Sequence, residues 1–145
     1  MKGAKFMINN YKVLKEKWER QDRKTKYQIY IAYVIFNCYK DSFLYETNDF
    51  SDLFIKVTQL VEPKATKQSM GGYINEFNKF DFTKSFGPQN NSNFAYHNQW
   101  NLTSLGAEFF FFMSDQILEY GKEYELDKLL PDYLKKYIPQ VYLNS

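Results

Sequence analysis

The sequence predicts a single α+β domain that is mostly helical. Apolar residues recur at spacings of three and four over several stretches, which is typical of amphipathic helices. After residue 80 the period changes, and aromatic and polar residues alternate on both sides of a turn-forming run, as they do in a β-hairpin. A chain of 145 residues with 44% hydrophobic content is long enough for one buried core, and neither a linker nor an internal repeat divides it.

Helical spacing covers most of the first forty residues. A basic helix is expected over residues 10–23, with one apolar face formed by Tyr11, Leu14 and Trp18. Residues 25–40 carry a wider apolar surface, so we expect this second stretch to lie at the centre of the core. Polar residues separate the two stripes, and the pattern leaves open whether they belong to one bent helix or to two.

Two further helices are expected in the middle of the chain. The first covers residues 50–62, follows several residues that favour helix starts, and ends before Pro63. After a short polar connection, residues 66–79 form the second. This helix contains Gly71 and Gly72, which cost about 2 kcal/mol relative to two alanines. The pair therefore needs a reason, such as close approach to a DNA phosphate or to a packed helix.

The remaining chain is expected to form a hairpin and two helices. Residues 82–102 predict two strands joined by a polar tip. A strongly apolar helix follows at residues 104–120, and its stripe is too wide for an ordinary surface helix. The last helix is expected at about residues 126–138, with Pro131 in its first turn.

The order helix, helix, turn, helix, hairpin, helix from residue 25 onward resembles a winged helix-turn-helix domain of the MarR-like and PadR-like kind. The sharpest local match is Trp100-Asn101-Leu102-Thr103-Ser104-Leu105-Gly106, which resembles the junction between the second wing strand and the following helix. The resemblance covers roughly residues 25–121. It implies an α+β, mostly helical fold, a winged helix-turn-helix with extra N- and C-terminal helices, in which the extra helices commonly serve dimer formation.

The resemblance also implies binding to double-stranded DNA, with the third helix in the major groove and the hairpin tip against the backbone or minor groove. The expected DNA-binding residues are Lys67, Gln68, Ser69, Tyr73, Asn75, Lys84, Gln89, Asn90, Asn91 and Asn93. This recognition helix and wing contain no arginine, although arginine to guanine is the commonest specific base contact. The function implied is a transcriptional regulator or another DNA-docking factor of a bacterial or mobile-element system.

The charge is divided unevenly along the chain. Residues 1–26 carry nine Lys and Arg residues against three acidic ones, a net charge of +6, while the whole chain carries +2, so the remainder carries −4. A basic end of this kind suits a phosphate backbone or an acidic protein surface, and the alternative is a solvated helix face.

A second function class remains open beside DNA binding. The aromatic content of 20%, the arginine-poor recognition helix and the negative balance of residues 27–145 fit an adaptor or accessory subunit that binds a protein, such as a nucleic-acid-processing enzyme. The expected interface with a protein partner or a second copy consists of Tyr11, Leu14, Trp18, Phe110 and Phe111.

Catalytic and metal-binding patterns are not evident in the sequence. His97 is the only histidine, and Cys38 lies on the apolar side of the expected central helix, where a thiol is usually an inert small hydrophobe. No His, Cys, Asp or Glu pair has metal-ligand spacing, so we expect no catalytic residues, no metal and no cofactor. The acidic run at residues 119–127 is more typical of a solvated helix junction than of carboxylate chemistry. A single cysteine and the lack of a membrane-spanning apolar run favour a cytoplasmic protein without membrane association.

Overall fold

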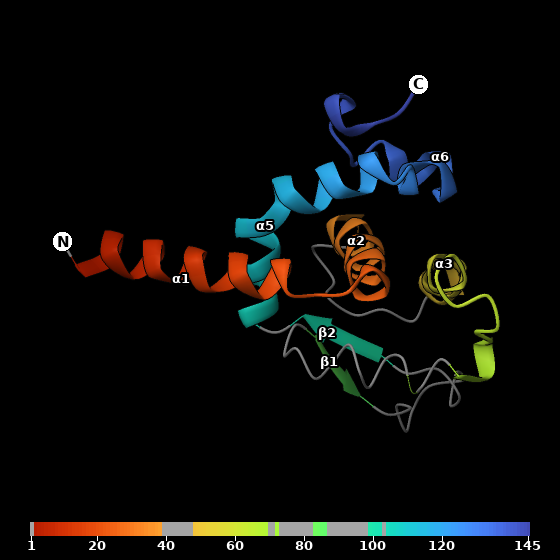
Figure 1. Cartoon of the computed structure of the whole chain (residues 1–145), viewed down its shortest axis with the longest axis horizontal. Helices are drawn as coiled ribbons and strands as arrows, with labels where there is room; N and C mark the ends of the chain where they lie inside the picture. The colour runs from red at the N-terminus through yellow and green to blue at the C-terminus, as the bar shows by residue number, and fades with distance from the viewer. Residues whose placement is uncertain (1, 39–47, 70–71, 73–82, 87–98, 103) are drawn as a thin grey trace.

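The computed structural model describes residues 2–38, 48–69, 72, 83–86, 99–102 and 104–145, and within them it places the side chains of residues 11–37, 52–69, 72 and 104–145 (Figure 1). The elements in chain order are helices α1 (Lys2–Glu19), α2 (Arg23–Cys38) and α3 (Asn48–Gln59), the 3₁₀ turn η1 (Lys67–Ser69), strands β1 (Thr83–Phe86) and β2 (Gln99–Leu102), helix α5 (Ser104–Glu123), the 3₁₀ turn η2 (Leu126–Leu129), helix α6 (Asp132–Lys135) and the 3₁₀ turn η3 (Gln140–Tyr142).

Residues 2–38 form two helices, because the first helix ends at Glu19 and the second begins at Arg23. Asp22 caps the start of α2: its Oδ1 accepts a hydrogen bond from the backbone N–H of Thr25 at 2.7 Å, and its carbonyl oxygen accepts one from Lys26 N–H at 3.0 Å. The hydrogen bonds from Thr25 help hold the pKa of Asp22 below its ordinary value, against the opposing effect of burial. The polar break in the sequence is therefore a helix boundary.

Helix α2 is the centre of the core, as its apolar surface predicts. It lies between α3 and α5, and Figure 1 shows it nearly end-on, enclosed by these helices. Tyr30, Ile31 and Ile35 are fully buried on it. Its partners contribute Phe54 from α3 and Phe109 from α5, both with no exposed surface. Burial of several large side chains of this kind stabilises the fold by roughly 1.5–3 kcal/mol each.

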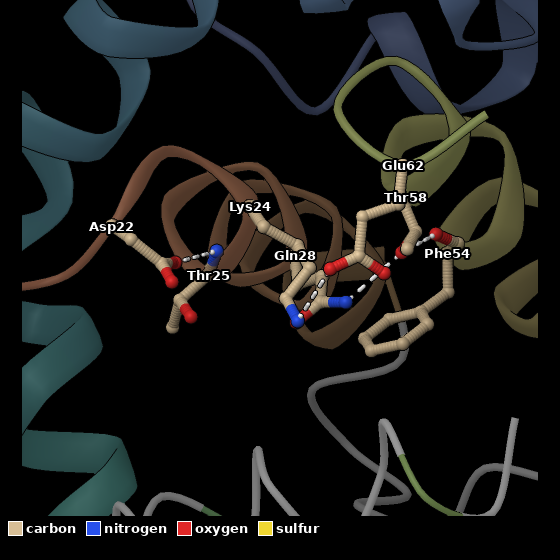
Figure 2. Close-up of polar contacts among 7 residues, drawn as sticks. All are labelled: Asp22, Lys24, Thr25, Gln28, Phe54, Thr58 and Glu62. Carbon is tan, nitrogen blue, oxygen red and sulfur yellow. Dashed lines mark hydrogen bonds and ion pairs between the residues drawn. The ribbon is translucent and has the colours of Figure 1, made fainter. Parts of the chain in front are cut away.

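A buried polar bridge fixes the contact between α2 and α3 (Figure 2). Gln28 Nε2 donates to Thr58 Oγ1 at 2.9 Å, and this hydroxyl donates in turn to the carbonyl oxygen of Phe54 at 2.7 Å. At the rim of the same contact, Lys24 Nζ lies 3.1 Å from Glu62 Oε1. Because buried polar groups are costly without partners, this chain of bonds sets the register of the two helices.

The winged helix-turn-helix expected as the α+β fold class is wrong. The part of the chain that the structure describes is mostly helical, and its core is formed by helices that pack on one another. A winged-helix domain needs a sheet against its recognition helix. Among the described residues, however, the strands are only β1 and β2, four residues each, paired antiparallel with Thr83 opposite Leu102.

The sequence pattern failed here for a physical reason. Alternation of polar and apolar residues predicts that two strands pair, but it does not say what the pair packs against. The apolar face of a helix likewise does not identify the element that covers it. The wide apolar faces of α2 and α5 are buried against each other. The described fold is therefore a helical bundle with a short β-ribbon.

The C-terminal region is broken into shorter pieces than the single helix expected over residues 126–138. Pro131 stands before α6 as its N-cap, with φ −67° and ψ 157°, so it ends the preceding turn rather than sitting inside a longer helix. Asp127 is buried and holds the segment that follows: its carboxylate accepts from Asn144 N at 2.9 Å and from Asn144 Nδ2 at 2.7 Å. The carbonyl oxygen of Lys122 also accepts from Asn144 Nδ2, at 2.9 Å, and so ties this segment to α5.

Candidate functional site

The segment expected to start the DNA-recognition helix forms the short turn η1 instead of a full turn of α-helix. Lys67 makes an ion pair with Asp52 of α3, while Gln68 and Ser69 are exposed. An added Cβ on Gly72 would meet no described heavy atom within 4 Å, so close packing among these residues does not explain this glycine.

Most of the other expected DNA contacts lie outside the described residues, namely Tyr73, Asn75, Gln89, Asn90, Asn91 and Asn93. The backbone of Lys84 is described, in β1 opposite Asn101 of β2. Of the ten expected DNA-binding residues, the structure brings together only Lys67, Gln68 and Ser69, as the three consecutive residues of η1.

Most of the expected partner interface lies inside the fold. Leu14, Trp18 and Phe110 are each at most 5% exposed. Tyr11 is half-buried and packs edge-on against Phe112, with ring centroids 6.1 Å apart, and its hydroxyl accepts from Gln116 Nε2 at 2.9 Å. Tyr11 and Trp18 therefore attach α1 to α5 within one chain. Phe110 packs instead on Tyr33 and Phe36 of α2.

Phe111 is the exception among the interface residues, because 74% of it is exposed. Its ring contacts Phe112, with centroids 5.3 Å apart. Successive residues of a helix point about 100° apart, so the four aromatic residues from Phe109 to Phe112 cannot all face one core. The unusual width of the α5 stripe was the sequence signal for this outward-facing ring.

The residues around Phe111 on the surface of α5 are small or acidic. Its helical neighbours four residues away, Ala107 and Asp115, are exposed, and Glu108 three residues before it is exposed as well. Asp115 Oδ1 accepts from the hydroxyl of Tyr142 at 2.9 Å. We call Ala107, Phe111 and their acidic neighbours Glu108 and Asp115 the Phe111 patch.

A cluster of cations and aromatic rings lies where α1, α2 and α5 meet, and the sequence patterns did not indicate it. Lys26 Nζ stands 5.2 Å from the ring centroid of Trp18 and 5.3 Å from that of Tyr120. Arg23 stands 5.4 Å from the ring of Tyr124, which contacts Tyr120 with centroids 4.5 Å apart. Burial raises the pKa of Tyr120 to about 12. These contacts fix the α1–α2 corner onto α5.

An open hollow with a volume of about 660 Å³ lies at the end of α5. The carboxylates of Glu119, Glu123 and Glu125 line it, together with Lys122 and the exposed apolar side chain of Val141. Lys122 Nζ donates to the carbonyl oxygen of Val141 at 2.7 Å. The sequence predicts only a solvated helix junction for this acidic run. We call this feature the acidic hollow.

Part of the basic N-terminal region presents its charge outward, whereas Lys24 and Lys26 are partly buried in contacts within the fold. Lys12 and Lys15 on α1 are exposed, as are Arg20 and Arg23 at the corner that follows. Val13, between the two lysines, is 62% exposed. This surface is interleaved with acidic residues, so its positive charge is spread along the helix.

The structure offers no metal site among the residues that it describes, since they contain no group of three His, Cys, Asp or Glu side chains arranged to hold an ion. None of the described helices has both the length and the apolar character that crossing a membrane requires. No protein-family model, no curated protein and no solved structure matches this chain.

Proposed function

We propose that this protein is a cytoplasmic adaptor or accessory subunit that binds a protein partner through the Phe111 patch and has no catalytic role. The observation that carries the proposal is the 74% exposure of Phe111 on a helix whose other aromatic residues pack into the fold. Aromatic residues, phenylalanine among them, are enriched at the buried centre of protein interfaces. The single cysteine, Cys38, fits a reducing compartment.

The chemistry of the patch defines the partner. Burial of an exposed phenylalanine in an apolar pocket of a partner contributes roughly 1.5–3 kcal/mol to the free energy of binding. Ala107 leaves room beside the ring, and Glu108 and Asp115 place negative charge at the rim. The partner surface is therefore an apolar pocket with basic residues beside it. Most of the binding energy comes from the ring, because exposed ion pairs contribute little.

Co-purification from the native host tests this proposal. The parent protein, Phe111→Ser and Leu60→Ser are compared at about 0.15 M and 0.5 M salt, where charge interactions are screened to different extents. Leu60 is a matched control, because it is also a large apolar residue that is 55% exposed, and it lies on the opposite side of α2, just after α3.

The expected result is a defined protein that binds the parent and Leu60→Ser at both salt concentrations and is lost with Phe111→Ser. Circular dichroism should show the same helix content for all three proteins, because neither change removes a buried side chain. If no protein binds, or if the two serine variants behave alike, the Phe111 patch is not a partner site.

A second candidate function is docking on double-stranded DNA through the α1–α2 corner. It is favoured by the +6 charge of residues 1–26 and by the exposure of Lys12, Lys15, Arg20 and Arg23. A gel shift with duplex DNA tests it at about 50 and 200 mM salt, between which phosphate-based binding weakens steeply. Lys12→Ala with Lys15→Ala should weaken the shift, and Lys56→Ala with Lys64→Ala should not. Lack of any shift at low salt excludes this candidate.

A further inference from the structure

Residues 139–145 run beside α5, and none of them is buried. The last buried residue of the chain is Ile138, which directly precedes them. Tyr142 and Leu143 pack against the core but remain partly exposed. We call residues 139–145 the C-terminal strap. Because the strap has few buried contacts, we expect it to open at a lower free energy than the helices of the core.

Two tethers of the strap are hydrogen bonds at the protein surface. Tyr142 Oη donates to Asp115 Oδ1 at 2.9 Å, and Lys122 Nζ donates to the carbonyl oxygen of Val141 at 2.7 Å. Both bonds are exposed to solvent, so water replaces them when the strap moves away. Each of these tethers therefore contributes little to the stability of the closed strap.

The third tether is partly buried and contributes more. Asn144 donates twice to the carboxylate of Asp127, from its backbone N–H at 2.9 Å and from Nδ2 at 2.7 Å. The same Nδ2 donates to the carbonyl oxygen of Lys122 at 2.9 Å. Hydrogen bonds to charged groups are roughly twice as strong as those between neutral groups. Asp127 is only 2% exposed beneath this tether, so we expect reagents in solution to reach its carboxylate when the strap opens.

One of the surface tethers belongs to the Phe111 patch. Phe111, Asp115 and Glu119 follow one another at spacings of four residues, and all three are exposed on the same side of α5. Tyr142 binds Asp115 through its hydroxyl, and it lines the acidic hollow together with Glu119. The closed strap therefore occupies one of the two carboxylates of the patch.

We propose that the C-terminal strap is an autoinhibitory element, which opens as a unit and must leave Asp115 before the partner of the Phe111 patch binds. This inference rests on the proposed function, because the partner is the one that the Phe111 patch defines. In the closed form, Tyr142 stands where a basic group of the partner would reach Asp115. In the open form, Asp115 and Glu119 are both accessible, so negative charge continues along α5 beyond Phe111. The affinity for the partner is then the intrinsic affinity multiplied by the open fraction.

Carboxyl labelling with a water-soluble carbodiimide and glycine amide measures the open fraction through Asp127. Mass spectrometry of peptides from the full chain gives the labelling rate. Asn144→Ala removes the side-chain bonds of the third tether and should raise the rate at Asp127 about tenfold. Tyr142→Phe is the decisive variant, because it removes only the hydroxyl bond to Asp115. It should raise the rate at Asp127 about threefold, since the strap opens as a unit.

Gln140→Ala is the matched control for these two variants. Gln140 is an exposed residue of the strap, and its side chain takes part in none of the three tethers, so the labelling of Asp127 should stay at the parental rate. The exposed carboxylate of Asp132 provides an internal reference, and its rate should be the same in every variant. Circular dichroism confirms that each variant is folded.

The second measurement uses the protein that co-purifies with the parent. Its dissociation constant should fall about tenfold for Asn144→Ala and about threefold for Tyr142→Phe, in proportion to the open fraction. Neither change alters Phe111, so a strap with a purely structural role predicts equal or weaker binding. Phe111→Ser should abolish binding and leave the labelling of Asp127 at the parental rate.

The proposal is overturned if Tyr142→Phe leaves the labelling of Asp127 unchanged, or if both strap variants bind the recovered protein no better than the parent does. Failure of the proposed function looks different. In that case Phe111→Ser and Leu60→Ser retain the same proteins, or no protein is recovered, while the labelling of Asp127 still responds to Tyr142→Phe. The strap then opens without guarding a partner site, and its autoinhibitory role is excluded together with the Phe111 patch.

Discussion

Replacing Gly121 by alanine should destabilise the protein, although the same change at a solvent-exposed position of a helix is normally stabilising. Gly121 is buried in α5, against the fully buried ring of Tyr30 from α2. An added Cβ would lie 2.5 Å from Tyr30 Cζ and closer still to Cε2 and Cδ2. Carbon atoms in contact are normally about 3.5–4.0 Å apart, so the ring has to retreat by more than about 1 Å inside a close-packed core.

The magnitude follows from two opposing effects. Alanine is favoured over glycine in a helix by about 1 kcal/mol. Overpacking a well-packed core costs about 1–3 kcal/mol, and a collision with a fully buried ring belongs at the upper end of that range. We therefore expect Gly121→Ala to lower the free energy of unfolding by about 2 kcal/mol.

Urea unfolding followed by circular dichroism measures this change as a lower midpoint with an unchanged slope. Gly72→Ala is the matched control: Gly72 is exposed, has no described atom near an added Cβ, and should lose no stability. In a Tyr30→Val background, where the ring is gone, Gly121→Ala should become neutral or stabilising. The reasoning is refuted if Gly121→Ala raises the midpoint in the parent protein.

Three further predictions concern polar groups of the core. Thr58→Val leaves Gln28 Nε2 without its buried acceptor and should cost about 1–3 kcal/mol in urea unfolding, whereas adding Gln28→Leu should restore part of the loss. Burial raises the pKa of Tyr120 from 10.0 to about 12, so the folded protein holds this proton more tightly than the unfolded chain. That contribution to stability is complete below pH 10 and is lost as the pH rises to about 12. Tyr120→Phe should make the alkaline loss of stability shallower in unfolding curves between about pH 9 and 12, and an unchanged slope would contradict the assignment. Asn144→Ala removes the side-chain hydrogen bond to the buried carboxylate of Asp127 but keeps the backbone bond, and it should lower the urea midpoint by an amount that corresponds to about 1–2 kcal/mol. Gln140→Ala, on the exposed turn η3, is the control for this last comparison and should leave the midpoint unchanged.

Much of the helical structure could be predicted from the sequence, because burial of one face leaves a local signature. The stripe of Leu14 and Trp18 and the central position of α2 both follow from spacing. The partner of each face could not be predicted in this way. The α1 stripe was expected to bind another protein, and it packs on α5 instead, because an apolar stripe carries no information about what covers it.

The candidate site was predictable only in part, for the same reason. Phe111 stood out because the aromatic run of α5 is too long for one core-facing stripe. The cluster of Lys26 with Trp18 and Tyr120 joins three separate elements, and no local pattern links them. The contact of Gly121 with Tyr30 is equally non-local, and the helix expected over residues 104–120 continues through this glycine to Glu123.

The attachment of α1 to the bundle has a consequence for how this protein can change over evolutionary time. Tyr11 and Trp18 anchor α1 through rings that pack on Phe112 and Tyr120 of α5, on the half of the helix nearer to α2. Substitutions in this half alter the stability of the whole domain. Substitutions in the first turns, which extend beyond the bundle in Figure 1, can alter what the helix meets at little cost to the fold. Selection on binding and selection on folding therefore act on different halves of the same helix.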